Sequence, residues 1–220
     1  MIKKIDHNKM GKADHGWLKT MHHFSFADYY NEEKMNFGNI RVINDDKIAP
    51  GSGFPMHPHS NMEIITYVIN GELTHGDSMG NERTLKRGGI QYMSAGRGVM
   101  HKELNQGDEE LRLLQIWISP NIEDQEPEYE DFDLNYQDRF GKDLVISDLM
   151  NIKQDIEIKA TEFMGVYEID GIGKHIYGLV VEGELVFNGK ALTESDAFVI
   201  VDEKANLITK GTAHILYFIQ

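Results

Sequence analysis

The chain has no cysteine among its 220 residues. This absence excludes disulfides, cysteine-ligated zinc, iron–sulfur clusters and thiol nucleophiles, so any metal must be held by His, Asp or Glu. Long hydrophobic runs are missing too: no segment approaches the roughly 18 apolar residues of a membrane span, and the N-terminus has no apolar signal segment. We therefore expect a cytoplasmic protein that has no membrane partner.

Basic residues are scarce relative to acidic ones. Lys and Arg total 22 against 36 Asp and Glu, which gives a formal net charge of -14. A strongly negative chain repels nucleic-acid phosphates and anionic membranes, and no useful cluster of Lys and Arg offsets this. We therefore expect no direct nucleic-acid partner and a small-molecule ligand.

Helical periodicity is also weak, and its best candidate is a short turn near Asp148–Gln154. Short β-branched and aromatic runs dominate instead, such as Met62–Leu73 and Leu111–Ser119, and Asn188–Gly189 is a typical hairpin turn. Many short strands with closely spaced turns predict an all-β chain, built as an antiparallel sandwich or barrel.

Two features suggest how these strands are grouped. The segment from Ser119 to Asp143 is acidic and contains two prolines, so we interpret it as a solvated connector. The segment Tyr67–Leu73 weakly matches Leu179–Leu185, which favours a duplicated β unit.

Two short pairs carry the chemistry: His57 with His59, and His101 with Glu103. Side chains two residues apart on a strand project from the same face, and Pro58 places the first pair at a strand start or edge. Either pair alone is more often a surface or hydrogen-bonded pair than a ligand pair. Together, on neighbouring strands, they would bring three imidazoles and a carboxylate to one metal ion.

Such a donor set suits Fe(II), Mn, Ni, Cu or Zn and does not choose among them. Four protein ligands leave two positions open on an octahedral ion, whereas a structural zinc site is closed and tetrahedral. An open metal next to a pocket favours catalysis over a purely structural role.

Longer motifs surround the pairs. The segment Gly51–Leu73 resembles the first cupin motif, and Gly88–Leu104 resembles the second in the form found in pirins. The segments His22–Tyr30 and Arg41–Phe54 add further pirin-like sequence. The chain therefore resembles the pirin family over nearly its whole length, and it is most similar to bacterial pirin-like proteins, some described as quercetin 2,3-dioxygenases.

This resemblance implies a bicupin: two antiparallel β-barrel (jelly-roll) domains packed together, with few short helices and metal only in the first. The expected divisions are an N-terminal metal-binding domain over 1–120, an acidic connector over 121–143, and a degenerate C-terminal cupin domain over 144–220, on which N-terminal residues can also pack. Aligning Gly71 with Gly183 puts Ile169 and Gly171 at the places of His57 and His59. The second unit is therefore not expected to repeat the site.

The resemblance further implies that His57, His59, His101 and Glu103 hold one divalent transition metal, with Fe(II) the first choice. Many cupins take their carboxylate ligand from the first motif, which here is Glu63, and spacing alone leaves both carboxylates open. If Glu103 is the ligand, Glu63 is expected to support the imidazoles or line the pocket. The apolar wall of the pocket is expected to include Phe54, Met56 and Tyr92.

The function implied is that of an oxidoreductase: a quercetinase that cleaves flavonols with O2 and releases carbon monoxide. Glu103 would be both ligand and general base. Two alternatives stay open: a redox-responsive metal-binding regulator that binds a protein partner without turnover, and a cupin isomerase or hydrolase acting on another small substrate. A monomer is expected.

Overall fold

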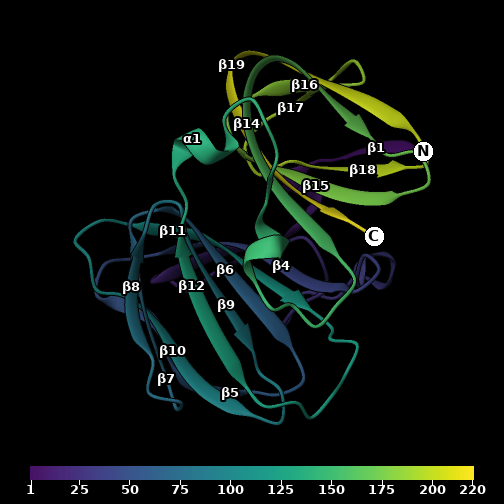
Figure 1. Ribbon diagram of the computed structural model, residues 1–220. Helices are drawn as coiled ribbons and strands as arrows, with labels where there is room; N and C mark the ends of the chain where they lie inside the picture. The colour runs from purple at the N-terminus through teal and green to yellow at the C-terminus, as the bar shows by residue number, and fades with distance from the viewer. The chain divides into compact units, whose positions relative to one another are not determined.

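Antiparallel β-strands make up most of the computed structural model, which describes residues 1–220 (Figure 1). The chain divides into two units. The N-terminal unit comprises Met10–Leu134 with Ile152–Gln154, and the C-terminal unit comprises Met1–Lys9, Asn135–Asn151 and Asp155–Gln220. The expected all-β class is confirmed.

The N-terminal unit contains two sheets. The seven-stranded sheet has the order β12-β9-β6-β11-β4-β3-β2 and the four-stranded sheet the order β5-β10-β7-β8. The bounds are β2 Gly11–Asp14, β3 Leu18–His22, β4 Ile40–Ile48, β5 Ser52–His59, β6 Glu63–Asn70, β7 Glu72–Asp77, β8 Glu82–Lys86, β9 Gly89–Ser94, β10 Val99–Asn105, β11 Leu111–Ile118 and β12 Glu128–Asp133, with a 3-10 turn at Glu32–Lys34. Leu73 and Leu85 of the smaller sheet share a buried cluster with Val68 and Leu113 of the larger one. Burial of these side chains holds the two sheets face to face.

The acidic stretch is more regular than the connector we expected. Its segment Glu128–Asp133 is strand β12, paired with β9, and Tyr129 packs against a buried apolar cluster. Arg83 reaches Asp131 at 2.9 Å and Asp133 at 2.8 Å. Strand β12 lies at the edge of the seven-stranded sheet, where charged side chains are common. The N-terminal unit therefore extends to Leu134 rather than ending at 120.

The C-terminal unit is one eight-stranded sheet with the main order β1-β18-β15-β19-β14-β13, and β16 joins β17 to β19. The bounds are β1 Ile2–Ile5, β13 Leu144–Val145, β14 Glu157–Asp170, β15 His175–Glu182, β16 Leu185–Phe187, β17 Lys190–Leu192, β18 Ala197–Val201 and β19 Lys204–Ile219. Its short helices are α1 Tyr136–Arg139 and 3-10 turns at His7–Lys9 and Ile146–Leu149, the last close to the predicted turn. The core includes Phe187, Phe198 and Ile215, none of them accessible to solvent.

A buried ionic group also lies in the C-terminal unit. Arg139 donates through Nε and Nη2 to one oxygen of Glu162, at 2.9 and 2.7 Å. His214 lies opposite Glu162 on the neighbouring strand, and burial lowers the pKa of its imidazole. Because the arginine already compensates the carboxylate, we interpret this group as a buried ion pair of the core.

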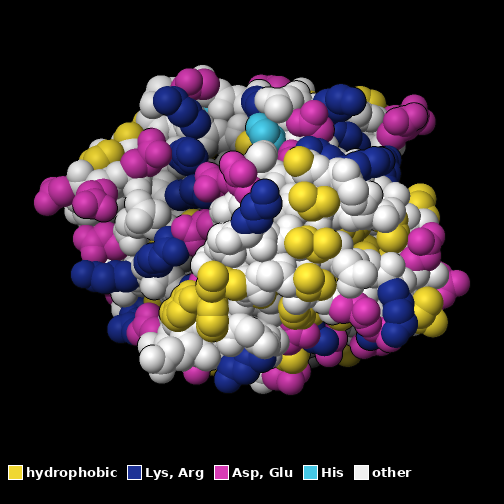
Figure 2. Space-filling model, turned by 90° about the horizontal axis from the view of Figure 1, so that it is seen from above, with side chains coloured by type: hydrophobic (Ala, Val, Ile, Leu, Met, Phe, Trp, Pro, Cys, Tyr) yellow, Lys and Arg dark blue, Asp and Glu magenta, His cyan; other side chains and the backbone are white.

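Charges of both signs are mixed on the molecular face shown in Figure 2, where Lys and Arg lie among Asp and Glu and hydrophobic side chains form small groups. None of the helices has the length and hydropathy that crossing a membrane requires.

Candidate metal centre

Three imidazoles from two paired strands converge inside the N-terminal unit. His57 and His59 come from β5 and His101 comes from β10, where His101 lies directly opposite His57 in the ladder. The ring centroids are 4.4 to 4.9 Å apart, and one ring nitrogen from each lies within 4.8 Å of the others. This is a grouping of imidazole nitrogens that a single metal ion can use.

A β-bulge shapes the β5 side of this cluster. Between the pairs His101–His57 and Glu103–Phe54, strand β5 has one residue more than β10. Such an extra residue reverses the alternation of side chains, so Phe54 faces the interior with its ring 6.3 Å from that of His57. Met56 points away and is 47% exposed, which corrects the prediction that it lines the pocket.

The bulge also fixes one histidine ring. Nδ1 of His57 lies 2.8 Å from the backbone carbonyl oxygen of Pro55, and a carbonyl can only accept. The Nδ1–H of His57 therefore donates to this oxygen, which leaves Nε2 as a free lone-pair donor. Hydrogen bonds of this kind set the tautomer and orientation of metal-ligating histidines.

The protonation and bonding of the rings suit a metal. Burial, and then the neighbouring imidazoles, lower the pKa of His59 to about 4 and that of His101 to about 3. Both rings are therefore neutral at pH 7, the form that binds metal. Both nitrogens of His101 are buried without a hydrogen-bond partner. A metal ion would satisfy one of them, so the residues present fit a metal held by imidazole.

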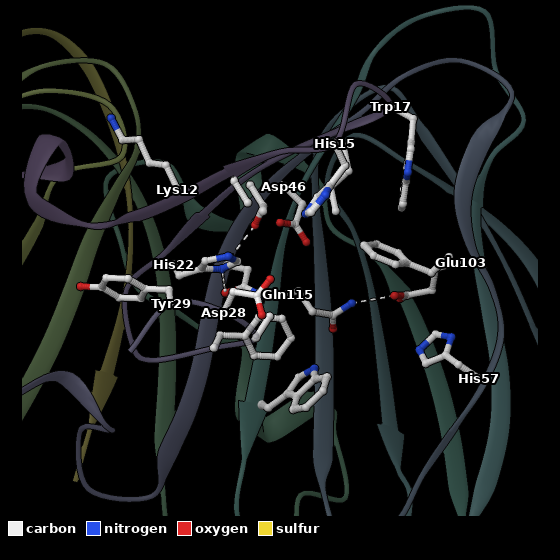
Figure 3. Close-up of a pocket in the computed structure, with 18 of the residues that line it drawn as sticks. Lys12, His15, Trp17, His22, Asp28, Tyr29, Asp46, His57, Glu103 and Gln115 are labelled. Carbon is white, nitrogen blue, oxygen red and sulfur yellow. Dashed lines mark hydrogen bonds between the residues drawn. The ribbon is translucent and has the colours of Figure 1, made fainter. Parts of the chain in front are cut away.

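Glu103 lies two residues beyond His101, and its carboxylate is held by three side chains of the opposite sheet. Its Oε1 accepts from the hydroxyl of Thr66 at 2.7 Å and from the amide of Gln91, and its Oε2 accepts from Gln115 at 2.6 Å (Figure 3). These three donors fix the direction of the carboxylate. Because a carboxylate oxygen has more than one lone pair, Oε2 can still bind a metal or a proton.

The three donors are a feature that sequence reasoning missed. Gln115, Thr66 and Gln91 are paired in register across β11, β6 and β9, so they form one row on the inner face. In the sequence each is a single polar residue inside an apolar strand run. That pattern signals a buried polar group with a partner, but only the register shows that the partner is Glu103.

His75 is a second residue that sequence reasoning missed. It is completely buried on β7, opposite Glu103 in the ladder, and its ring centroid is 5.6 Å from that of His101. Its Nε2 lies 3.1 Å from a carboxylate oxygen of Asp77, and its ring stacks on Tyr129 at 4.5 Å. The His75 ring therefore helps to fix the position of His101.

Glu63 lies away from this group, which corrects the expectation that it supports the imidazoles or lines the pocket. The strand that carries His57 and His59 ends at His59, and the next strand begins at Glu63 in the other sheet, after Asn61 with φ of 49°. The carboxylate of Glu63 accepts from Tyr92, from Ser94 at 2.7 Å and from the backbone amide of Lys153 at 3.0 Å. Tyr92 is likewise fully buried beside Glu63 and is not part of the pocket wall.

A cavity of about 670 Å³ opens next to the cluster (Figure 3). Its aromatic lining consists of Trp17, Phe26, Tyr29, Phe54 and Trp117, and its polar lining includes Lys12, His15, His22, Asp28, Asp46, His57, His59, Glu103 and Gln115. Of the three predicted wall residues, only Phe54 lines it. A cavity that combines aromatic walls with convergent polar groups is typical of a small-molecule site.

One lining residue has an unusual charge state. Burial raises the pKa of the Asp46 carboxyl to about 7, and the nearby charges of Asp45 and Glu103 act in the same direction. Because the folded pKa exceeds the unfolded value of 3.8, the folded protein binds more protons between these values, and Asp46 makes folding less favourable as the pH rises.

We therefore expect Asp46→Asn to stabilise the protein more at high pH than at low pH. The difference in unfolding free energy between variant and wild type should grow by about 2–3 kcal/mol from about pH 5 to about pH 8. Urea unfolding of both proteins at several pH values measures this difference. A difference that stays constant with pH would show that Asp46 has an ordinary pKa in the folded protein.

Comparison with known proteins agrees with this geometry. The family model described as Pirin matches residues 4–118. The chain is 42% identical to a pirin-like protein of Caulobacter vibrioides, with 95% of this chain and 94% of that one covered. The chain belongs to the pirin family.

Two further pirin relatives bear on the site. The quercetin 2,3-dioxygenase of Escherichia coli K12 is 41% identical, over 90% of this chain and 89% of that one. The bacterial pirin YhhW of Escherichia coli, solved in complex with nickel(II), superposes with a TM-score of 0.90 at 36% identity and covers 100% of this chain and 98% of its own. The resemblance to pirins and the bicupin fold inferred from the sequence are both confirmed.

Proposed function

We propose that this pirin is a metal-dependent dioxygenase that cleaves flavonols such as quercetin with O2 and releases carbon monoxide. The observation that carries the proposal is the cluster of three imidazoles, together with Glu103 in the lining of the aromatic-walled cavity beside it. The name of the relative from Escherichia coli K12 supports the same reaction.

Four side chains would hold the metal: His57, His59 and His101 through ring nitrogens, and Glu103 through Oε2. When bound, a divalent ion would lower the pKa of a coordinated substrate hydroxyl and supply open positions for the reactants. Fe(II) remains our first choice, and the nickel complex of YhhW adds Ni(II) as the second ion to test.

Glu103 has the position of a general base. Glu103 lines the cavity and would take the proton from the flavonol 3-hydroxyl, while Thr66, Gln91 and Gln115 keep the carboxylate from turning away. Proton removal makes the flavonol electron-rich enough to react with O2. Both oxygen atoms then enter the organic product, and one ring carbon leaves as carbon monoxide.

The aromatic lining would orient the substrate. The ring of Trp117 lies 4.9 Å from that of His59 and 5.4 Å from that of Phe26, in edge-to-face contacts. Phe54 contacts Trp17 at 5.3 Å in the same manner. These rings form apolar walls that fit a flat aromatic ligand and exclude water from the reacting atoms.

The test is to measure carbon monoxide and O2 uptake with quercetin and protein loaded with Fe(II) or Ni(II). The expected result is one carbon monoxide released for each O2 consumed, and none with metal-free protein. Fully metal-loaded protein that releases no carbon monoxide would overturn the proposal and favour metal binding without turnover.

A further inference from the structure

Asp46 has no role in the chemistry described above, although it lies in the same cavity. It comes from β4, between Thr20 of β3 and Leu113 of β11, and only 3% of its surface is exposed. Its Oδ1 is buried and has no hydrogen-bond partner. Figure 3 shows the carboxyl among the lining side chains, between His22 and Glu103 in that view.

The fold does not supply this oxygen with a partner. Arg112, on the neighbouring strand β11, is engaged by Asp45, with bonds of 2.9 and 2.7 Å. The hydroxyl of Thr20 bonds the Asp46 carboxyl but does not satisfy Oδ1. An unpaired buried acceptor costs about 1–3 kcal/mol, so its position in a ligand cavity calls for an explanation by function.

We propose that Asp46 is a substrate-binding residue, which hydrogen-bonds a hydroxyl group of an aromatic substrate other than the one held near His57 and Glu103. A ligand hydroxyl would give Oδ1 its missing partner, whereas an analogue without it would leave the oxygen unpaired in a dry site. The site therefore selects polyhydroxylated aromatics over otherwise equal compounds. This inference rests on the proposed function for the class of substrate.

The charge state of Asp46 is compatible with this role. Because burial raises its pKa to about 7, the carboxyl can accept or donate a hydrogen bond near neutral pH. Asp28 also lines the cavity but is exposed, so water already satisfies its carboxylate. Asp28 is thus a matched control: it is an acidic residue of the same cavity, but it has no buried, unpaired oxygen.

The experiment compares quercetin with 3-hydroxyflavone, which keeps the 3-hydroxyl and carbonyl but lacks the other hydroxyls. Binding to metal-loaded protein is followed without O2, by quenching of tryptophan fluorescence. We expect the wild-type protein to bind quercetin at least about tenfold more tightly. Asp46→Leu should reduce this preference to about twofold or less by weakening quercetin alone. Asp46→Asn, which keeps the shape, should retain part of the preference, and Asp28→Asn all of it.

The outcomes separate this inference from the proposed function. The role of Asp46 would be overturned if the wild type, Asp46→Asn and Asp46→Leu all showed the same preference for quercetin over 3-hydroxyflavone. A wild-type protein without this preference would overturn it too, even if carbon monoxide is released. A preference that depends on Asp46 without release of carbon monoxide would support the binding role and refute the dioxygenase. Binding of neither flavonol to the wild type would overturn both.

Discussion

Replacing His101 with alanine is expected to remove the metal almost completely. The variant loses the buried ring that lies within 4.9 Å of both other imidazoles, and the two remaining rings stand on a single strand. Bound metal should fall from about one ion per chain to less than about a tenth of that, because a site with a missing ligand is far weaker. Elemental analysis of protein purified without added metal, and again after reconstitution, measures the change.

His175→Ala is the matched control. His175 is exposed on β15 of the C-terminal unit and lies outside each group of potential ligands. This variant should keep the wild-type metal content. Near-ultraviolet circular dichroism of both variants checks that they are folded. Full metal content in folded His101→Ala would mean that the metal lies elsewhere.

Glu103→Gln is expected to produce a large loss of turnover per bound metal ion. The amide cannot take a proton from the substrate. Its nitrogen would face either Gln115 or the pair Thr66 and Gln91, so at least one donor would lose its acceptor. We expect kcat for flavonol cleavage to fall by about 10²–10⁴-fold, the usual contribution of a general base. Release of carbon monoxide by protein of measured metal content determines kcat per bound ion.

Glu63→Gln tests the other carboxylate. It removes an acceptor for Tyr92, Ser94 and Lys153, so we expect lower stability with kcat per bound metal ion unchanged. A normal kcat in Glu103→Gln together with a large loss in Glu63→Gln would reverse the assignment of the two carboxylates.

The sequence was sufficient to predict the fold class and to bring the right segments together. Apolar runs with period two and turn residues between them define strands almost independently of context. The two short pairs at His57 and His101 were informative because alternation puts each pair on one face. The structure adds that their strands are direct neighbours in the four-stranded sheet.

Where the chain leaves regular alternation, sequence reasoning failed. The expectation that Glu63 supports the imidazoles requires it to follow His59 on the same strand, but the residues between them carry the chain to the other sheet. Met56 was misplaced because it is adjacent to His57 and so points to the opposite face, whereas the bulge between Phe54 and His57 brings Phe54 to the inner face. Neither a crossing between sheets nor a bulge leaves a strong mark in a single sequence.

The sequence also did not show which polar residues hydrogen-bond to one another. Thr66, Gln91 and Gln115 lie far apart in the sequence, and only the register of β6, β9 and β11 brings them to Glu103. The unpaired oxygen of Asp46 is equally invisible before the neighbouring strands are placed. Polar residues in apolar strands mark such positions, but hydrogen bonds between strands depend on the three-dimensional fold.

The most direct test of a metal held by these imidazoles is a crystal structure of the metal-loaded protein, with anomalous diffraction recorded at the absorption edge of the ion. We predict one strong peak per chain, about 2.0–2.2 Å from a nitrogen of each of His57, His59 and His101. A peak at the buried Glu162 and His214 group instead, or no peak within bonding distance of the three rings, would contradict the account.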